Sequence, residues 1–196
     1  MALELVCGPM FSGKTGLLIE RLAAAEELGL RALALKPAAD TRSSSLVTHS
    51  GGSYPATTWR PGEPLPAGDE EVIAVDEVQF VDLAHLGALT CAAAGRTLVV
   101  AGLDLDFRRE PFPSVAELEG VAEVVHRLTA TCSRCLRPAL FTQRLVDGRP
   151  AGFDDDTVRI GAEELYQPRC GACYEAERDP SGDARTVREP WRSLPR

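Results

Sequence analysis

One short stretch near the start of the chain restricts the fold more than any other feature. Residues 8–15 read GPMFSGKT, which fits the pattern of Gly, four residues, Gly-Lys-Ser/Thr that builds a phosphate-binding loop. A mostly apolar run at residues 3–7 precedes this loop, and apolar residues at helical spacing follow it at 17–22. Strand, loop and helix therefore come in the required order. A glycine-rich turn that matches by chance is the competing interpretation.

Each residue type in the loop has a chemical reason to be there. Gly8 and Gly13 permit backbone conformations that a Cβ forbids, so successive N–H groups can turn toward a polyphosphate at a helix N-terminus. The Lys14 ammonium suits the β- and γ-phosphates, and the Thr15 hydroxyl is placed to bind the Mg²⁺ that bridges them. The predicted nucleotide-binding residues are Gly8, Pro9, Met10, Phe11, Ser12, Gly13, Lys14 and Thr15.

Composition narrows the class of protein. The 196 residues allow one ordinary domain plus an appendage, and the 44% hydrophobic and 26% charged residues are typical of a globular protein. A formal net charge of −8 argues against a surface that holds a nucleic-acid polymer. No apolar run approaches a membrane span, and Met1 leads into the first strand without the pattern of a signal peptide. The expected location is therefore the cytoplasm, with no membrane partner.

Two carboxylates follow another apolar run. Residues 72–75 read VIAV, and Asp76 and Glu77 come directly after them. Side chains just past the carboxyl end of a buried strand lie on the edge where open α/β sheets bind ligands. Asp76 is predicted to reach Mg²⁺ through water, and Glu77 is a candidate general base. An acidic cap on the helix expected at about 81–94 is the alternative; the phosphate loop upstream favours the metal site.

The first half of the chain alternates between helical and strand patterns. We expect a helix at about 14–27 that stops at Gly29, and strands at 32–35 and 97–101. Residues 38–71 predict a long loop with at most one short strand. This alternation indicates an α/β fold of the P-loop NTPase type, with a mostly parallel sheet and helices on both faces. The nucleotide-binding domain is expected to occupy residues 1–127.

Two phenylalanines and two arginines in residues 102–112 (GLDLDFRREPF) follow the strand at 97–101. They are suited to line a site for a flat ring near phosphates. Core packing and solvated charges explain the same composition, and composition alone favours that simpler account.

The second half carries two CxxC pairs separated by 34 residues: Cys132 with Cys135, and Cys170 with Cys173. Four thiolates make a closed tetrahedral site, which predicts structural Zn²⁺. A redox CxxC is the competitor, but it explains only one pair. Cys7 and Cys91 lie in apolar segments and are expected to be buried thiols. We expect a small zinc-binding domain at 128–176 and a disordered tail at 177–196.

Taken together, these motifs resemble the thymidine kinases of the cytosolic, zinc-containing type (type II) over roughly residues 3–175. GPMFSGKT is similar to the family's phosphate loop, and Asp40-Thr41-Arg42 with Thr48-His49 resembles its DTR…TH segment. DEVQF at 76–80, GLDLDFRREPF at 102–112, and LTATC with FTQRL are also similar to family motifs. Residues 160–166 resemble the segment that closes the family's lasso-like loop over the base.

The resemblance implies roles for the remaining residues. Glu77 would take the proton from the 5′-hydroxyl of deoxyribose as it attacks the γ-phosphate of ATP, with Arg42 and Arg109 helping with charge. Phe80, Phe107 and Phe112 would pack around the pyrimidine, and Tyr166 would close the pocket. Gln79 would lie near the sugar, and Thr142 beside the thymine methyl group. The backbone at 158–166, including Val158, Ile160 and Gly161, would read the base edge.

The resemblance therefore implies an enzyme that makes dTMP from thymidine, and from deoxyuridine, in pyrimidine deoxynucleotide salvage. It also implies a homotetramer with feedback inhibition by dTTP. The alternative from another class is a P-loop nucleotide-binding switch or a zinc-ribbon module that binds nucleic acid, against which the net charge already counts.

Overall fold

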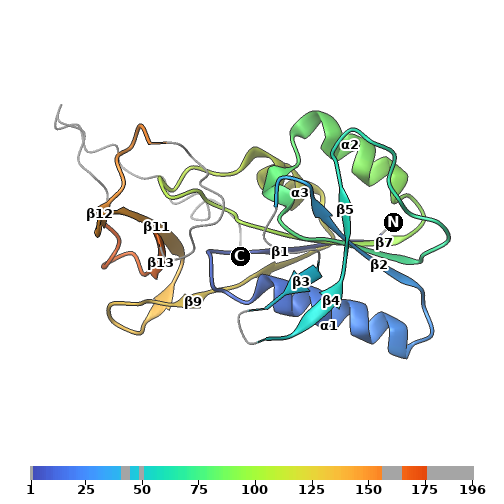
Figure 1. Ribbon diagram of the computed structural model, residues 1–196, viewed down its shortest axis with the longest axis horizontal. Helices are drawn as coiled ribbons and strands as arrows, with labels where there is room; N and C mark the ends of the chain where they lie inside the picture. The colour runs from blue at the N-terminus through green and yellow to red at the C-terminus, as the bar shows by residue number, and fades with distance from the viewer. Residues whose placement is uncertain (1, 41–44, 49–50, 156–164, 176–196) are drawn as a thin grey trace.

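A computed structural model describes residues 2–40, 45–48, 51–155 and 165–175 (Figure 1). Its centre is a six-stranded sheet in which every neighbouring pair is parallel, in the order β5-β2-β6-β7-β1-β8. The strands are β1 (Ala2–Cys7), β2 (Ala32–Pro37), β5 (Thr57–Trp59), β6 (Val72–Val75), β7 (Thr97–Gly102) and β8 (Val124–Arg127). The prediction of a mostly parallel α/β sheet is confirmed.

Helices cover both faces of this sheet (Figure 1). On one face α1 (Lys14–Glu27) packs Leu18 and Leu22 against the sheet. On the other face α2 (Leu83–Ala92) and α3 (Pro113–Val121) bury residues such as Leu89 and Leu118. The strands read as continuous apolar runs because both of their faces are buried.

The predicted elements correspond closely to the observed ones. The helix at 14–27 and the strand at 72–75 have the expected bounds, and Gly29 adopts a left-handed φ of 77° just past the helix. The loop at 38–71 holds more structure than expected. Strands β3 (Ser45–Val47) and β4 (Ser53–Pro55) form a hairpin, and β5 extends the central sheet. Burial of Trp59 at the end of β5 stabilises this strand, which the polar local sequence does not predict.

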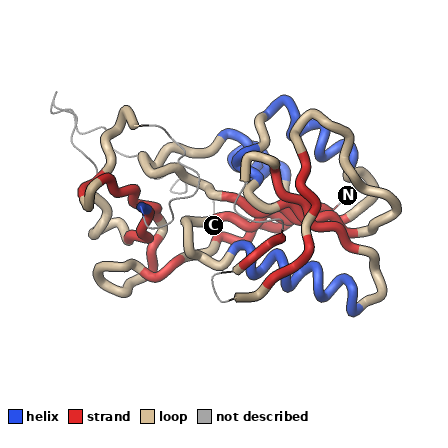
Figure 2. Tube along the Cα trace, in the orientation of Figure 1, coloured by secondary structure: helices blue, strands red, loops and turns tan. Residues whose placement is uncertain are grey.

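The second half is built from short antiparallel strands and loops (Figure 2). Strands β9 (Ala130–Thr131) and β10 (Pro138–Ala139) form a pair. Strand β11 (Phe141–Val146) lies between β12 (Arg149–Pro150) and β13 (Tyr166–Arg169). The central sheet ends with β8 at Arg127. Within the described residues, no helix is both long enough and apolar enough to span a membrane.

Burial along α1 generates a test of the core. Leu22 is fully buried, whereas Leu28, just past the end of the same helix, keeps 78% of its surface exposed. We expect Leu22→Ala to lower the free energy of unfolding by about 2–5 kcal/mol, because it leaves a cavity under the sheet. Leu28→Ala should change it by less than about 0.5 kcal/mol. Denaturant titration of both variants measures this, and equal losses would contradict the packing described.

Candidate active site and cysteine cluster

The loop at residues 8–15 joins β1 to α1 through backbone conformations that favour glycine. Gly8 has a φ of 146° and Gly13 a φ of 88°, and Phe11 also has a positive φ of 64°. A Cβ on Gly8 would lie 2.4 Å from the carbonyl oxygen of Leu128, so no side chain fits there. Gly13 has open space around it, so its requirement is conformational. The loop therefore turns sharply where it enters α1.

The Lys14 ammonium lies inside this loop. Its Nζ donates to the carbonyl oxygens of Gly8, at 3.1 Å, and Pro9, at 2.7 Å. Burial lowers the pKa of Lys14, while the nearby carboxylates of Glu77, Asp76 and Asp104 act in the opposite direction. The positive charge is thus held among acids at the carboxyl end of the sheet.

A direct hydrogen bond joins the loop to the acidic pair. The Thr15 hydroxyl donates to Asp76 Oδ2 at 2.8 Å, and the Glu77 N–H donates to Asp76 Oδ1 at 3.0 Å. Asp76 is 6% exposed, and burial, followed by the charge of Glu77, raises its pKa. A buried carboxyl between a hydroxyl and another acid is an environment that a cation would stabilise.

Glu77 occupies an uncommon backbone conformation. Its φ is 52°, and it precedes the short 3₁₀ helix η1 (Val78–Phe80). The Gln79 side-chain amide donates to Glu77 Oε2 and accepts from the N–H of Leu103 at 3.1 Å. Left-handed φ values on residues with side chains cluster at functional sites, where the surrounding structure maintains them. The Gln79 amide is thus hydrogen-bonded to the side chain of the candidate base.

Another buried charge pair lies at the end of the neighbouring strand β2. Lys36 Nζ is 2.9 Å from Asp40 Oδ2, and both side chains are almost fully buried. Strand β2 pairs with β6 up to Leu35 and Val75, and the Asp76 N–H donates to the Leu35 carbonyl at 3.0 Å. The pair is therefore next to the acidic residues at the same sheet edge. Sequence reasoning included Asp40 through the DTR resemblance but did not find Lys36.

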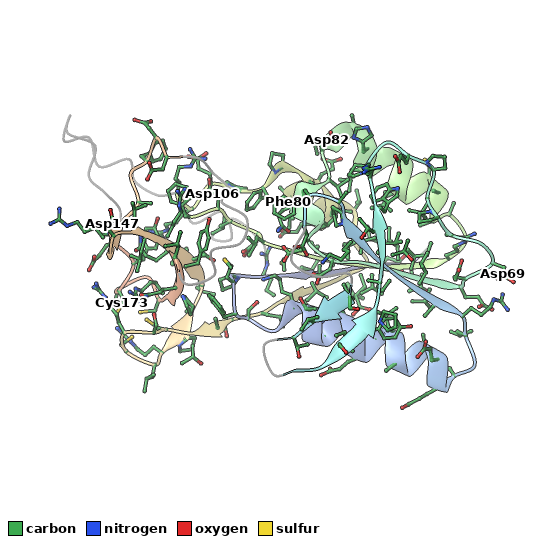
Figure 3. The ribbon with its side chains drawn as sticks, in the orientation of Figure 1. Asp69, Phe80, Asp82, Asp106, Asp147 and Cys173 are labelled. Atoms are coloured by element: carbon green, nitrogen blue, oxygen red, sulfur yellow. The ribbon has the colours of Figure 1, made fainter. Side chains whose placement is uncertain are left out.

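A buried aspartate shapes the loop after β7. Asp106 (Figure 3) accepts at Oδ1 from the N–H groups of Arg108, at 2.8 Å, and Glu110, at 2.9 Å, and its Oδ2 accepts from Arg108 Nε. The Phe107 ring, 4% exposed, has the guanidinium groups of Arg108 and Arg144 within 5.3 Å of its centroid. The loop at 102–112 is thus a packed cation–π assembly that contacts the second half.

Three contacts connect this region to the second half of the chain. The Met10 N–H of the 8–15 loop donates to the Thr142 hydroxyl on β11 at 3.0 Å. The Arg109 guanidinium lies 3.9 Å from the ring centroid of Phe141, and the Tyr174 hydroxyl donates to the Phe107 carbonyl. Thr142 therefore belongs to the same site as the loop. Sequence reasoning missed Tyr174, for which no motif gave a signal.

The remaining predicted site residues are distributed as follows. Phe80 ends η1 and is half-buried, and Phe112 packs against the core beneath α3. Tyr166 begins β13, half-buried, opposite Arg144. Arg42, Val158, Ile160 and Gly161 lie outside the described residues, as does the predicted tail at 177–196.

The four CxxC cysteines form one cluster. The Sγ atoms of Cys132, Cys135, Cys170 and Cys173 all lie within 4.8 Å of one another, and Figure 3 shows Cys173 among sulfur atoms far from the central sheet. Tetrahedral Zn²⁺ bonds of ~2.3 Å to sulfur put ligand sulfurs ~3.8 Å apart. Arg137 Nε donates to Cys135 Sγ at 3.4 Å, which lowers the pKa of that thiol and favours the thiolate that binds metal. The cluster therefore fits a zinc site.

The other two cysteines differ from each other. Cys7 is buried at the end of β1, and burial raises the pKa of its thiol to about 11. Cys91 is exposed on α2. The prediction of a buried thiol is confirmed for Cys7 and wrong for Cys91, because the apolar sequence of α2 does not reveal which side of the helix faces solvent.

Comparison with known proteins gives consistent results. The family model for thymidine kinase matches residues 1–174. The thymidine kinase of Roseiflexus sp. (strain RS-1) is 44% identical over 182 residues, which cover 88% of this chain and 94% of that protein. The thymidine kinase of Halobacterium salinarum (strain ATCC 29341 / DSM 671 / R1) is 40% identical over 185 residues, covering 90% of this chain and 95% of that protein.

The cysteine geometry predicts the metal content. We expect the purified chain to hold about one zinc ion, and Cys170→Ser to lose most of it because the site then lacks one of its thiolate ligands. Cys91→Ser is the matched control, since Cys91 is exposed on α2 and outside the cluster. Elemental analysis after gel filtration measures both. Full zinc content in Cys170→Ser would contradict the four-cysteine site.

Proposed function

The chain belongs to the thymidine kinase family, and on that premise we propose how its residues transfer phosphate from ATP to thymidine. The observation that carries the proposal is the contact between the 8–15 loop and the acidic pair, through Thr15 Oγ1 and Asp76 Oδ2 at 2.8 Å. This hydrogen bond connects the N-terminus of α1, which is suited to bind phosphate, with the acidic pair. The acidic pair is suited to bind a metal ion and to accept a proton.

On the donor side, we assign the ATP phosphates to the loop at residues 8–15, as in P-loop NTPases. The N–H groups of residues 11–15 are the proposed donors, because Pro9 has no N–H and the Met10 N–H donates to Thr142. Lys14 would exchange its two carbonyl partners for the β- and γ-phosphates, whose charge is a better match for a buried ammonium. Thr15 and Asp76 offer the oxygen ligands that Mg²⁺ prefers and would hold it directly or through water. Magnesium held there would neutralise charge on the ATP phosphates. We assign Arg42 to help neutralise the same phosphate charge.

On the acceptor side, we assign Glu77 as the general base for the 5′-hydroxyl of thymidine. Phosphoryl transfer depends chiefly on positioning and electrostatics, so a carboxylate beside Lys14 and Asp76 is well placed. The remaining assignments concern the nucleoside and the transferred phosphate. The pyrimidine would be packed by Phe80, Phe107, Phe112 and Tyr166, its methyl group would lie beside Thr142, and its edge would be read by Val158, Ile160 and Gly161. The resemblance puts Gln79 near the sugar and gives Arg109 a role with the phosphate charge.

We further propose that zinc occupies the cysteine cluster, in a domain of residues 128–176 distinct from the kinase domain of residues 1–127. Zinc would tie together the ends of β9 and β13, in a region whose own core is small. A homotetramer, feedback inhibition by dTTP, acceptance of deoxyuridine and a place in dTMP salvage in the cytoplasm complete the proposal.

The role of Glu77 is tested by Glu77→Gln, which keeps the size of the side chain and removes its basicity. We expect kcat for thymidine to fall by roughly 10²–10⁴-fold, the typical contribution of a general base. Binding of ATP should change little, since Glu77 is not among the residues assigned to ATP. Glu117→Gln, an exposed carboxylate on α3, is the control. Phosphate transfer followed by radiolabel gives the rates, and normal turnover of Glu77→Gln would exclude the assignment.

The link between Met10 and Thr142 predicts a second result. Thr142→Val keeps the shape and removes the acceptor, so the part-buried Met10 N–H loses its partner at a cost of about 1–3 kcal/mol. Because the bond joins the 8–15 loop to β11, we expect KM to rise for both ATP and thymidine. Thr142→Ser keeps the hydroxyl and should retain the KM for ATP. If Ser and Val behave alike toward ATP, the hydrogen bond does not position the loop.

A further inference from the structure

The orientation of the Glu77 carboxylate depends on contacts made by its neighbours in η1. The Glu77 backbone is held at φ 52°, with its N–H on Asp76 Oδ1 and its carbonyl accepting from the Phe80 N–H at 3.0 Å. The side chain has a separate support, because Gln79 Nε2 donates to Glu77 Oε2.

Gln79 is itself held by the backbone just past the end of β7. Its side chain is 9% exposed, and its Oε1 accepts from the Leu103 N–H at 3.1 Å. A backbone N–H can only donate, so the amide oxygen must face Leu103 and the amide nitrogen must face Glu77. The hydrogen bond to Leu103 therefore sets which end of the amide meets the carboxylate.

Gly102, the last residue of β7, leaves the space that Gln79 needs. A Cβ built on Gly102 would lie 2.8 Å from Gln79 Oε1, 2.9 Å from Val78 Cγ1 and 3.2 Å from Val115 Cγ2. The first two distances are shorter than carbon contacts allow, so η1 or its side chains would have to move. Movement of η1 away from Gly102 is restricted, because Val78 is fully buried and its carbonyl accepts from Ser114 Oγ on α3 at 3.2 Å.

We propose that Gly102 and Gln79 form a positioning device for the catalytic carboxylate, in which the Gln79 amide orients Glu77 and Gly102 provides the space for that amide. The proposal rests on the assignment of Glu77 as base and departs from the expectation that Gln79 contacts the sugar. Gln79 acts through Glu77, and Gly102 acts through Gln79 and Val78.

Positioning of Glu77 and contact with the sugar are alternative roles for Gln79, and they predict opposite kinetic effects of a substitution. Gln79→Met keeps the length of the side chain and removes its hydrogen bonds. A misplaced carboxylate slows the chemical step, so we expect kcat to fall roughly tenfold to a hundredfold, with KM for thymidine within about twofold of wild type. A residue that holds the sugar would instead raise KM for thymidine and leave kcat nearly unchanged, and that result would overturn the proposal.

Gly102→Ala supplies an independent test, because the added Cβ would approach Gln79, Val78 and Val115. Gly102 itself is not among the residues assigned to the substrate. We expect a loss of kcat like that of Gln79→Met. Gly87→Ala is the matched control, since a Cβ on this exposed glycine of α2 meets nothing within 4 Å. Unchanged kcat in a folded Gly102→Ala, judged by its unfolding midpoint, would overturn the requirement for space.

A double-mutant cycle separates positioning from general damage to the fold. If Gly102 acts through the Gln79 amide, Gly102→Ala should cost clearly less in kcat when Gln79 is already Ala, and fully multiplicative losses would overturn the link. Glu77→Gln separates the role of Glu77 as base from the positioning of its carboxylate. A large loss in Glu77→Gln with normal kcat in Gln79→Met would retain the base and reject the positioning device, whereas normal turnover in Glu77→Gln would reject the base itself.

Discussion

The hydrogen bond between Thr15 and Asp76 is the contact on which the rest of the site depends. It joins the first turn of α1 to the end of β6, two strands away from β1 in the sheet. The parallel register makes this possible, because Leu5 and Val75 both pair with Val100 and so bring the ends of β1 and β6 to one edge. Burial lowers the pKa of Lys14 and raises the pKa of Asp76 and of Asp104, and the Lys14 charge opposes the shift of both carboxyls.

The second half of the chain completes this edge from the other side. Thr142 on β11 accepts from Met10, while Phe141 on the same strand packs against Arg109 and Tyr174. Strand β11 is hydrogen-bonded to β13, which leads directly to Cys170. A metal in the cysteine cluster would therefore hold the strand that contacts the 8–15 loop, so a structural ion would influence the candidate site without touching a substrate.

The local sequence pattern predicted the parts of the structure that consist of consecutive or regularly spaced residues. The loop at 8–15, the strand at 72–75 with its acids, and the CxxC pairs were all found because spacing alone defines them. The contacts between distant segments were not found. Nothing in the sequence near Gln79 indicates that Leu103 binds its amide, and the requirement at Gly102 is for space instead of a positive φ. Strand β5 and Lys36 were missed because tertiary burial, and not local periodicity, determines their conformation.

The proposed arrangement of Glu77 and the 8–15 loop is tested most directly by a crystal structure of the chain with thymidine and a non-hydrolysable ATP analogue. We expect the triphosphate on the N–H groups of residues 11–15 and the Glu77 carboxylate within about 2.6–3.2 Å of the thymidine 5′-oxygen, with that oxygen in line with the γ-phosphate. A Glu77 carboxylate turned away from the 5′-oxygen in that ternary complex, with another group within hydrogen-bond distance of the 5′-oxygen, would exclude Glu77 as the base.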